Sequence, residues 1–482
     1  MSHFKLSFLS FLLILPLFSI AQTNLSKEKQ TIVDRLDAKT EKLAGVARQI
    51  WELAELGYQE KESTKLLQTQ LKNAGFTIET GVADIPTAFV ASYGQGEPVI
   101  GILAEYDALP GISQDDVPMQ QAREGSSAGH ACGHHLFGTG STAAAIAVKE
   151  WMEKNNQTGT IRLYGTPAEE GGAGKVYMVR AGLFDDVDVV LHWHPSSGNG
   201  ADARSSLSNK SAKFRFYGQA SHAAVAPERG RSALDGVEAM NHMVNLLREH
   251  VQMETRIHYV ITRGGEAPNV VPAFAEAFYY VRHPEMQEVK ATFERVVKAA
   301  EGAALGTGTK MEYEVIHGLY NVLPNKILSE KMYQNLKMVG GVQYDAKERA
   351  FAEKIISSYP DKKVTPEMAA QVSDFKVVER GSGGSTDVGD VSWAVPTAGL
   401  GAATWVPGTT AHSWQAVAAG GTSIGTKGMM VAAKTIALTA VDLFKDPRIT
   451  KKALEELKTR RGKDFKYEPL LGDRKPPLDY RN

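Results

Sequence analysis

The apolar and polar positions in the N-terminal part of the chain alternate between helical and strand periodicities. Apolar residues recur at helical spacing over 27–57 and again over about 61–74, which predicts two amphipathic helices. A further helix, rich in alanine and other small residues, is predicted over 138–155. Short apolar runs predict strands at 89–93, 99–104, 160–165 and 188–195. Strands and helices that alternate in this way predict an α/β domain with a mostly parallel sheet.

The order of the predicted elements changes after residue 210. Strands are predicted at 213–218, 256–263, 274–282 and 310–317, and helices at 232–250 and 286–304. This β-α-β-β-α-β order is that of the split ferredoxin-like unit. We therefore expect an α+β domain over residues 210–318, inserted into an α/β catalytic domain that spans 22–209 and 319–445.

The two ends of the chain differ from the rest. Lys5, the apolar run 6–18 and the small residues Ser19 and Ala21 predict a secretory signal peptide over residues 1–21. The apolar run is too short for a comfortable membrane span, so we expect a periplasmic or secreted protein without a membrane anchor. At the other end, residues 446–482 are rich in Lys, Arg and Pro, and we expect a short helix and an irregular surface tail.

Composition narrows the class of protein. Of the 482 residues, 43% are hydrophobic and 23% are charged, as in a soluble globular protein. The formal net charge of −1 lacks the excess of positive charge that is typical of nucleic-acid-binding proteins. The chain holds one cysteine, so an internal disulfide is excluded and stability must come from core burial.

That cysteine lies in the densest group of metal-ligand residue types in the chain. Residues 129–135 read GHACGHH and combine Cys132 with three histidines. Cys132 and His134 can bind one metal ion if the backbone turns at Gly133. The competing interpretation is a buried free cysteine beside surface histidines. An exported protein would expose a free thiol to oxidants, which favours a thiolate bound to metal.

Acidic and imidazole side chains follow three of the predicted strands. Glu105 and Asp107 follow the strand at 99–104, Glu169 and Glu170 follow that at 160–165, and a histidine ends that at 188–195. The carboxyl ends of parallel strands meet at one edge of a sheet, where ligands bind. A two-metal site would be completed by Cys132, His134, Glu170, one of the histidines at 192 and 194, and His412. A solvated acidic turn is the competing interpretation of Glu169 and Glu170.

Eight short motifs occur in the order found in a known family. They are 105–110 (EYDALP), 130–134 (HACGH), 167–171 (PAEEG), 193–195 (WHP), 218–222 (GQASH), 268–272 (PNVVP), 385–389 (STDVG) and 411–413 (AHS). Together they resemble the M20 metallopeptidase clan, within it the amidohydrolase branch called subfamily D. The resemblance implies a zinc-peptidase-like catalytic domain and an inserted domain that forms a homodimer.

The resemblance also implies roles for particular residues. Cys132, His134, Glu170 and His412 would bind divalent metal, with two ions per chain, Mn²⁺ or Zn²⁺, expected. Glu169 would be the general base that takes a proton from water. His222 would reach a neighbouring active site to stabilise the oxyanion, and Asn269 would hold the substrate.

Two positions depart from the family pattern. Many members have Asp or Asn where this chain has His135, which we interpret as a neighbour of the ligands rather than a ligand. The strand ligand matches His192 in many members and His194 in others. We favour His194, and the two side chains are expected on the same side of the strand.

These observations predict an exported, metal-dependent amidohydrolase. Its expected substrates are N-acyl amino acids, aminobenzoyl-glutamate-like amides or dipeptides. A related alternative is an exopeptidase for short peptides. A different alternative is a binding module without catalytic activity on the same fold, which the presence of Glu169 and of a full ligand set argues against.

Overall fold

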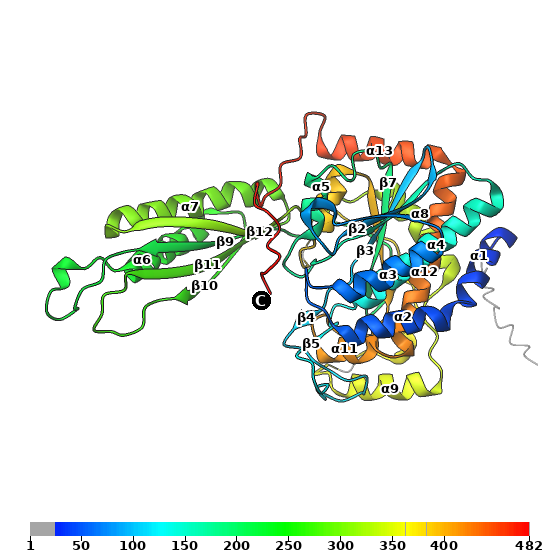
Figure 1. Cartoon of the computed structure of the whole chain (residues 1–482), viewed down its shortest axis with the longest axis horizontal. Coiled ribbons are helices and arrows are strands. Elements are labelled where there is room, and N and C mark those ends of the chain that lie inside the picture. The colour runs from blue at the N-terminus through cyan, green and yellow to red at the C-terminus, as the bar shows by residue number, and fades with distance from the viewer. Residues whose placement is uncertain (1–24, 362, 382, 482) are drawn as a thin grey trace, which may run out of the picture.

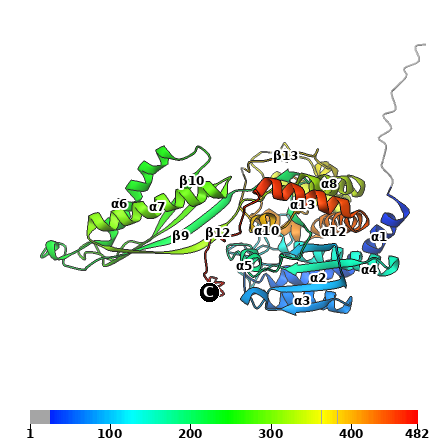
Figure 2. The same cartoon turned by 90° about the horizontal axis from the view of Figure 1, so that it is seen from above.

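The computed structural model describes residues 25–361, 363–381 and 383–481. The predicted signal peptide lies outside these residues. None of the helices in the described ranges is long and apolar enough to cross a membrane. The chain forms a large α/β part and a narrow α+β part that projects from it (Figures 1 and 2).

A six-stranded mixed sheet forms the centre of the large part. Its strand order is β1-β2-β6-β3-β7-β14. The strands are β1 (Thr77–Thr80), β2 (Phe89–Gln95), β6 (Gly159–Gly165), β3 (Val99–Ala104), β7 (Val189–Ser196) and β14 (Thr397–Ala403). β6, β3, β7 and β14 run parallel, as the alternating pattern predicted. β1 pairs antiparallel with β2, because the connection between them is too short for the crossover that parallel neighbours need, and β2 pairs antiparallel with β6.

Two long helices pack against each other and against the sheet. They are α4 (His134–Asn155) and α12 (Ser423–Lys445). Small residues in α4 permit this close packing: a Cβ atom at Gly140 would lie 3.0 Å from both Trp193 and Met429. Because α4 begins at His134, its packing places the start of the helix at the edge of the sheet where β3, β6 and β7 end.

The helix predicted over 27–57 is in fact two helices. α1 (Lys27–Asp37) and α2 (Thr40–Leu53) are separated at Ala38 and Lys39. α1 packs against α12, whereas α2 packs mainly against α4. The apolar spacing continues across the break, so the pattern could not reveal that the two halves have different packing partners.

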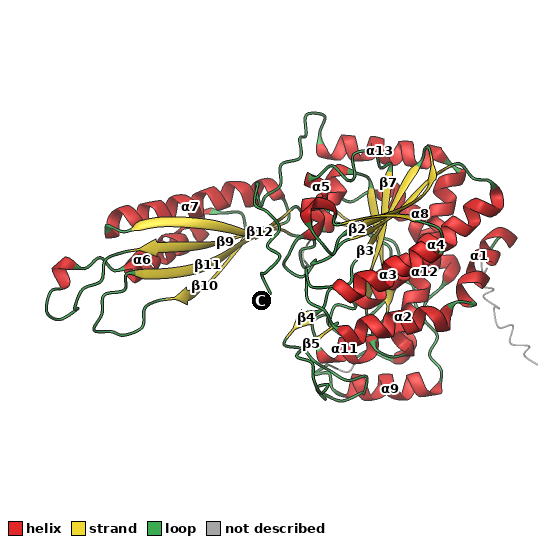
Figure 3. Cartoon of the chain, viewed as in Figure 1, coloured by secondary structure: helices red, strands yellow, loops and turns green. Residues whose placement is uncertain are grey.

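The projecting part is a four-stranded antiparallel sheet with two helices. The chain order is β9 (Ser208–Tyr217), α6 (Ala233–Leu247), β10 (Arg256–Arg263), β11 (Phe274–His283), α7 (Met286–Thr307) and β12 (Lys310–Leu319). The sheet order β10-β11-β9-β12 is that of the split ferredoxin-like unit. α6 and α7 pack together on the sheet, as Figure 3 shows in red against yellow strands. This leaves β10 at one edge of the sheet.

The C-terminal segment is irregular beyond its helix, as its composition predicted, but it is anchored to the rest of the protein. After α13 (Pro447–Arg461), the chain turns back and ends between the two parts of the molecule (Figure 1). Leu470 and Leu471 are each only 3% exposed. These two leucines anchor the segment to the rest of the protein. The composition did not reveal them, because charged residues dominate the segment.

Candidate metal centre and active site

The turn predicted at Gly133 brings Cys132 and His134 together at the start of α4. Gly133 has φ +75°, and a Cβ atom there would lie 2.7 Å from Pro195. Only glycine fits this left-handed, crowded position. The Sγ atom of Cys132 lies 3.4 Å from Nε2 of His194 at the end of β7. One ligand atom each from Cys132, His134 and His194 lie within 4.8 Å of one another.

Hydrogen bonds fix which nitrogen of each histidine can bind metal. Nδ1 of His134 lies 2.8 Å from Oδ1 of Asp107, and Nδ1 of His194 lies 2.7 Å from the carbonyl oxygen of Pro195. Both partners can only accept, so Nδ1 is the protonated nitrogen in each ring. Nε2 is then the nitrogen that each ring can offer to a metal ion, the arrangement that a carboxylate or carbonyl behind a metal ligand produces.

A second group shares Cys132 with the first. Cys132, Glu170 and His412 also offer ligand atoms within 4.8 Å of one another. Nε2 of His412 lies 3.0 Å from Oε1 of Glu170, and the backbone N–H of His412 donates to Ala131 over 2.9 Å. His412 has φ +60°, an uncommon conformation for histidine, and its side chain is 54% exposed. The shared thiolate and the open side at His412 suit a pair of metal ions reached from solvent.

Glu169 lies on the other side of this arrangement. It forms a third group with Glu105 and His134, again within 4.8 Å. Oε2 of Glu105 lies 3.1 Å from Nε2 of His134, while its Oε1 lies 2.7 Å from Nζ of Lys175. The structure thus separates the two adjacent carboxylates: Glu170 groups with His412, and Glu169 groups with Glu105.

The site carries an excess of buried negative charge. Glu105, Asp107 and Asp387 are each at most 1% exposed, and Glu169 and Glu170 lie beside them. Lys175 is the only buried lysine or arginine among the described residues, and it contacts both Glu105 and Asp387 at 2.7 Å. Buried carboxylates in this number require more than one positive charge, which divalent cations would supply.

The pKa values reflect this charge. Burial, with Glu105 and Glu170, raises the pKa of Glu169 well above its usual value. Burial also raises the pKa of the Cys132 thiol. Burial opposes a charge on His134, but Asp107, Cys132 and Glu105 together raise its pKa well above the ordinary range. These directions describe a site that holds protons where a metal ion would replace them.

The donor set therefore fits divalent metal. One soft thiolate, three imidazoles and a carboxylate are typical ligands of Zn²⁺ and related ions. Nε2 of His134 and Oε1 of Glu170 are buried and make no hydrogen bond within the described part of the chain, although Glu105 and His412 lie close to them. Such buried polar atoms are expected where a bound ion is their partner.

The other histidines of the region point elsewhere. The ring of His192 lies over Gly399 on β14, where a Cβ atom would meet its Nε2 at 2.3 Å. His135 directs Nε2 to the carbonyl of Gly420 at 3.0 Å, and His130 directs Nε2 to that of Ile50 at 3.0 Å. None of these three belongs to a candidate metal group in the described residues. Of His192 and His194, only His194 lies in one of these groups within the described residues.

His222 and Asn269 lie outside this site. They are neighbours in the projecting part, where Ala223 N–H donates to the carbonyl of Asn269 over 3.0 Å. Both are in loops beyond the far ends of β9 and β11, whereas those strands meet the large part at their other ends (Figures 1 and 2). Within one chain, the structure does not bring them to the metal ligands.

Lys175 and Asp387 were not predicted as site residues from the sequence. Asp387 lies within the motif at 385–389, which was the available signal for it. Lys175 lies in the short helix α5 (Gly174–Arg180), among apolar residues that carried no sign of an ion pair. Only the fold brings the two together beneath Glu105.

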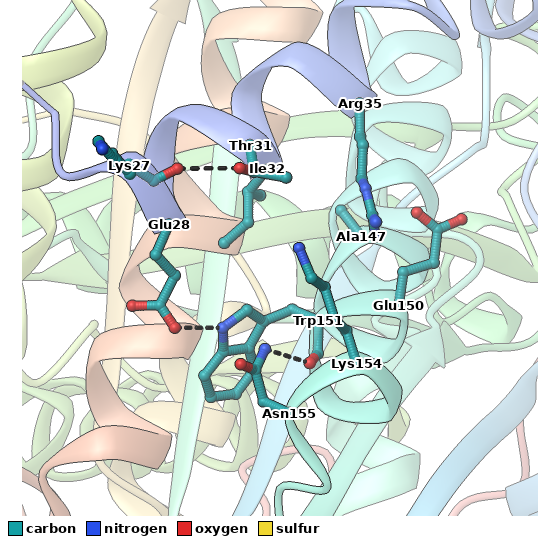
Figure 4. Close-up of a pocket in the computed structure, with 10 residues that line it drawn as sticks. All are labelled: Lys27, Glu28, Thr31, Ile32, Arg35, Ala147, Glu150, Trp151, Lys154 and Asn155. Carbon is teal, nitrogen blue, oxygen red and sulfur yellow. Dashed lines mark hydrogen bonds between the residues drawn. The ribbon is translucent and has the colours of Figure 1, made fainter.

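Two cavities differ in their relation to the site. A cavity of about 530 Å³ is lined by His192 and His194 and by polar residues that include Arg204, Asn325 and Ser329. A smaller one, of about 280 Å³, lies between α1 and α4 around Trp151, whose indole N–H donates to Glu28 (Figure 4). Trp151 is roughly 25 Å along α4 from His134 at 1.5 Å per residue, so this cavity is separate from the metal groups.

The sequence is similar to those of known hydrolases and peptidases. The model of peptidase family M20/M25/M40 matches residues 101–419. A p-aminobenzoyl-glutamate hydrolase subunit of Escherichia coli is 43% identical over 451 residues, which cover 88% of this chain and 94% of that protein. The Xaa-Arg dipeptidase of Mus musculus is 30% identical over 448 residues, covering 90% and 92%.

Two solved structures share the fold. An aminobenzoyl-glutamate utilization protein from Klebsiella pneumoniae has a TM-score of 0.60 at 18% identity and covers 85% of this chain and 97% of its own. A dinuclear metal-binding peptidase of the M20 family from Bacillus subtilis has a TM-score of 0.54 at 21% identity, covering 84% and 99%. The family match spans the segment that contains every candidate metal ligand, and the chain therefore belongs to peptidase family M20/M25/M40 as an amide-hydrolysing enzyme.

Proposed function

We propose that this protein is a metal-dependent amidohydrolase that cleaves the amide bond of N-acyl amino acids or aminobenzoyl-glutamate-like substrates. The observation that carries the proposal is the pair of ligand groups that share Cys132, with Glu169 beside them. Cys132, His134 and His194 would hold one divalent ion, and Cys132, Glu170 and His412 the other. Mn²⁺ and Zn²⁺ are the ions we propose.

When bound, the metal ions would polarise the substrate carbonyl and lower the pKa of a water molecule. Glu169 would take the proton from that water and pass it to the leaving nitrogen. Its raised pKa suits a carboxyl that must both accept and release a proton, and bound cations would bring it back toward the working range. Lys175 holds Glu105, which keeps this second carboxylate from competing for the same proton.

The substrate class is proposed from the E. coli relative, at 43% identity. The cavity beside His194 has polar walls, which include Arg204 in an ion pair with Asp202 at 2.9 Å. A dipeptidase activity is the second candidate, because the murine Xaa-Arg dipeptidase is similar over 90% of this chain.

A substrate screen separates the two candidates. Purified protein loaded with Mn²⁺ or Zn²⁺ is assayed on aminobenzoyl-glutamate, N-acetyl amino acids and dipeptides with C-terminal arginine. Faster hydrolysis of the first two groups supports the main proposal, and a preference for the dipeptides replaces it. Hydrolysis of none of them by metal-loaded protein contradicts both.

We also propose a homodimer through the projecting part. β10 is an edge strand, and Val260 and Ile261 on it are 58% and 44% exposed. An apolar, unpaired edge strand is a ready surface for a second copy. In such a dimer, His222 and Asn269 of one protomer would serve the active site of its partner, where His222 would stabilise the oxyanion.

Export is a separate proposal that rests on residues 1–21. Cleavage before Gln22 would leave Lys27, the first residue of α1, close to the new N-terminus. Intact mass measurement of the protein from a native periplasmic or culture fraction tests this, since retention of residues 1–21 would contradict it.

A further inference from the structure

Glu169 and Glu170 lie on a strained loop. This carboxylate loop comprises residues 167–173, between β6 and α5. Ala168 and Ala173 have φ of +58° and +60°, and Gly171 has φ +93°. Left-handed conformations are unfavourable for a residue with a Cβ atom, and they persist only where surrounding contacts hold them. The loop that carries Glu169 and Glu170 therefore depends on its neighbours for its shape.

Three contacts from the catalytic domain hold parts of this loop. Oε1 of Glu60 accepts from the N–H of Ala168 over 2.8 Å, and Oδ2 of Asp107 accepts from the N–H of Glu170 over 2.9 Å. The hydroxyl of Tyr58 donates to the carbonyl of Gly172 over 2.7 Å. These contacts leave the carbonyl of Glu170 to be held from another direction.

The end of the chain provides that contact. The hydroxyl of Tyr480 donates to the carbonyl oxygen of Glu170 over 3.0 Å, and Nη2 of Arg481 donates to the same oxygen over 2.5 Å. The ring of Tyr480 packs edge-on against Tyr58, with centroids 5.6 Å apart. A Cβ atom at Gly57 would lie 2.2 Å from the Tyr480 hydroxyl, so glycine there leaves the space that Tyr480 fills.

The segment that delivers Tyr480 and Arg481 is itself anchored along its length. We call residues 462–481 the C-terminal arm. Arg180 of α5 donates to the carbonyls of Gly472 and Arg474 over 2.8 and 2.9 Å. Arg474 in turn donates to the carbonyls of Val315 and Ile316 on β12 over 2.7 and 2.6 Å. These bonds to fixed backbone groups reduce the freedom of the arm before its tip reaches the loop.

We propose that the C-terminal arm is part of the active-site architecture, and that Tyr480 and Arg481 are positioning residues for the carboxylate loop. Both peptide groups that flank the Cα atom of Glu170 are held, the N–H by Asp107 and the carbonyl by the tip of the arm. Because Asp107 also orients His134, the arm completes a continuous set of contacts behind two candidate ligands. The expected effect on metal affinity rests on the proposed function, whereas the expected effect on the amide exchange of the loop does not.

Variants at the tip of the arm test the inference without removing the arm. Tyr480→Phe removes one hydroxyl and keeps the ring against Tyr58, Arg481→Ala removes the guanidinium, and Arg481→Lys keeps the charge. Lys466→Ala is the matched control, because it removes an exposed cation of the same arm. Hydrogen exchange of metal-free protein is followed by mass spectrometry on peptides that cover 168–174. Metal affinity is measured by competition with a chelator, and kcat and KM at saturating metal.

The double variant Tyr480→Phe with Arg481→Ala should raise the exchange rate of the loop amides about tenfold, as loss of such contacts does. Its metal affinity should fall by about 10–100-fold, the usual effect of losing a group behind a ligand. kcat should fall with little change in KM, Arg481→Lys should recover part of each loss, and Lys466→Ala should match the unmodified protein. Exchange that stays unchanged overturns the inference, as does faster exchange with unaltered metal affinity and kcat.

Glu170→Gln separates failure of this inference from failure of the proposed function. If it keeps full metal affinity, Glu170 is not a ligand and that part of the proposed function fails. The arm is then judged by loop exchange and kcat, which must still respond together. If Glu170→Gln loses metal while the double variant at the arm does not, the ligand assignment stands and the arm has no positioning role.

Discussion

The Sγ atom of Cys132 lies 3.4 Å from Nε2 of His194, a nitrogen left free because Nδ1 of the same ring is bonded to the carbonyl of Pro195. His192, two residues earlier on the same strand, lies over Gly399 instead. The sequence favoured His194 but left both histidines open, and the direction of their rings separates them.

This contact leads to a prediction about metal content. Cys132→Ser should remove most of the bound metal, because a hydroxyl is a harder and far less acidic ligand than a thiol and Cys132 belongs to both groups. His194→Ala should lower the content toward one ion per chain, and His192→Ala should leave it unchanged. Elemental analysis of the purified variants gives the answer. Equal metal content in His194→Ala and unmodified protein would move the ligand role to another residue.

The adjacent carboxylates predict opposite effects for two matched variants. Glu169→Gln keeps shape and hydrogen bonding but cannot accept a proton, so kcat should fall about 10²–10⁴-fold with metal content retained. KM should change far less, because the proton transfer occurs in the transition state. Glu170→Gln should weaken metal binding first. Steady-state kinetics and metal analysis are carried out on both variants. If Glu169→Gln loses metal and Glu170→Gln retains it, the two roles are exchanged.

The dimer proposal predicts a dependence on the edge of the inserted sheet. Val260→Lys places a charge on the exposed face of β10 and should shift the protein from dimer to monomer in light scattering at micromolar concentration. Met119→Lys, at a 55% exposed position in the large part, is the control and should remain dimeric. If His222 acts across the interface, the monomeric variant should also lose activity. A monomer for the unmodified protein would remove the dimer and the proposed role of His222.

Asp390 predicts how stability changes with pH. Burial raises its pKa from 3.8 to about 7, although Tyr467 and the N–H of Tyr320 donate to it over 2.7 and 2.9 Å. The folded protein therefore holds a proton that the unfolded chain releases near pH 4. Stability should fall as pH rises from about 4 to 7, by on the order of 4 kcal/mol at most at 1.36 kcal/mol per pKa unit.

Asp390→Asn tests this assignment, because the amide cannot ionise and its oxygen can still accept a hydrogen bond. Denaturant unfolding at pH 5 and pH 8 should show a smaller loss of stability between the two values in the variant than in the unmodified protein. The same loss in both proteins would assign the pH dependence to other groups.

The sequence by itself determined the order of elements and the kinds of chemistry available. Periodicity of apolar residues is a local property, so it predicted four of the six strands of the central sheet, β2, β3, β6 and β7, and the β-α-β-β-α-β order of the insert. Ligand identity is also local: a thiol, imidazoles and paired carboxylates at strand ends indicated a metal site before any geometry was known. The motifs added the family, which the comparisons confirmed.

Tertiary structure decided everything that depends on which residues meet. The break between α1 and α2 follows from different packing partners, and the antiparallel pairing of β1 with β2 follows from a short connection. The burial of Lys175 between Glu105 and Asp387 joins residues up to 282 positions apart, as 387 − 105 shows. The C-terminal arm looked like a solvated tail because charge dominates its composition, yet Tyr480 and Arg481 end on the carbonyl of Glu170. Contacts between residues distant in sequence leave no periodic trace, so only the folded chain could show them.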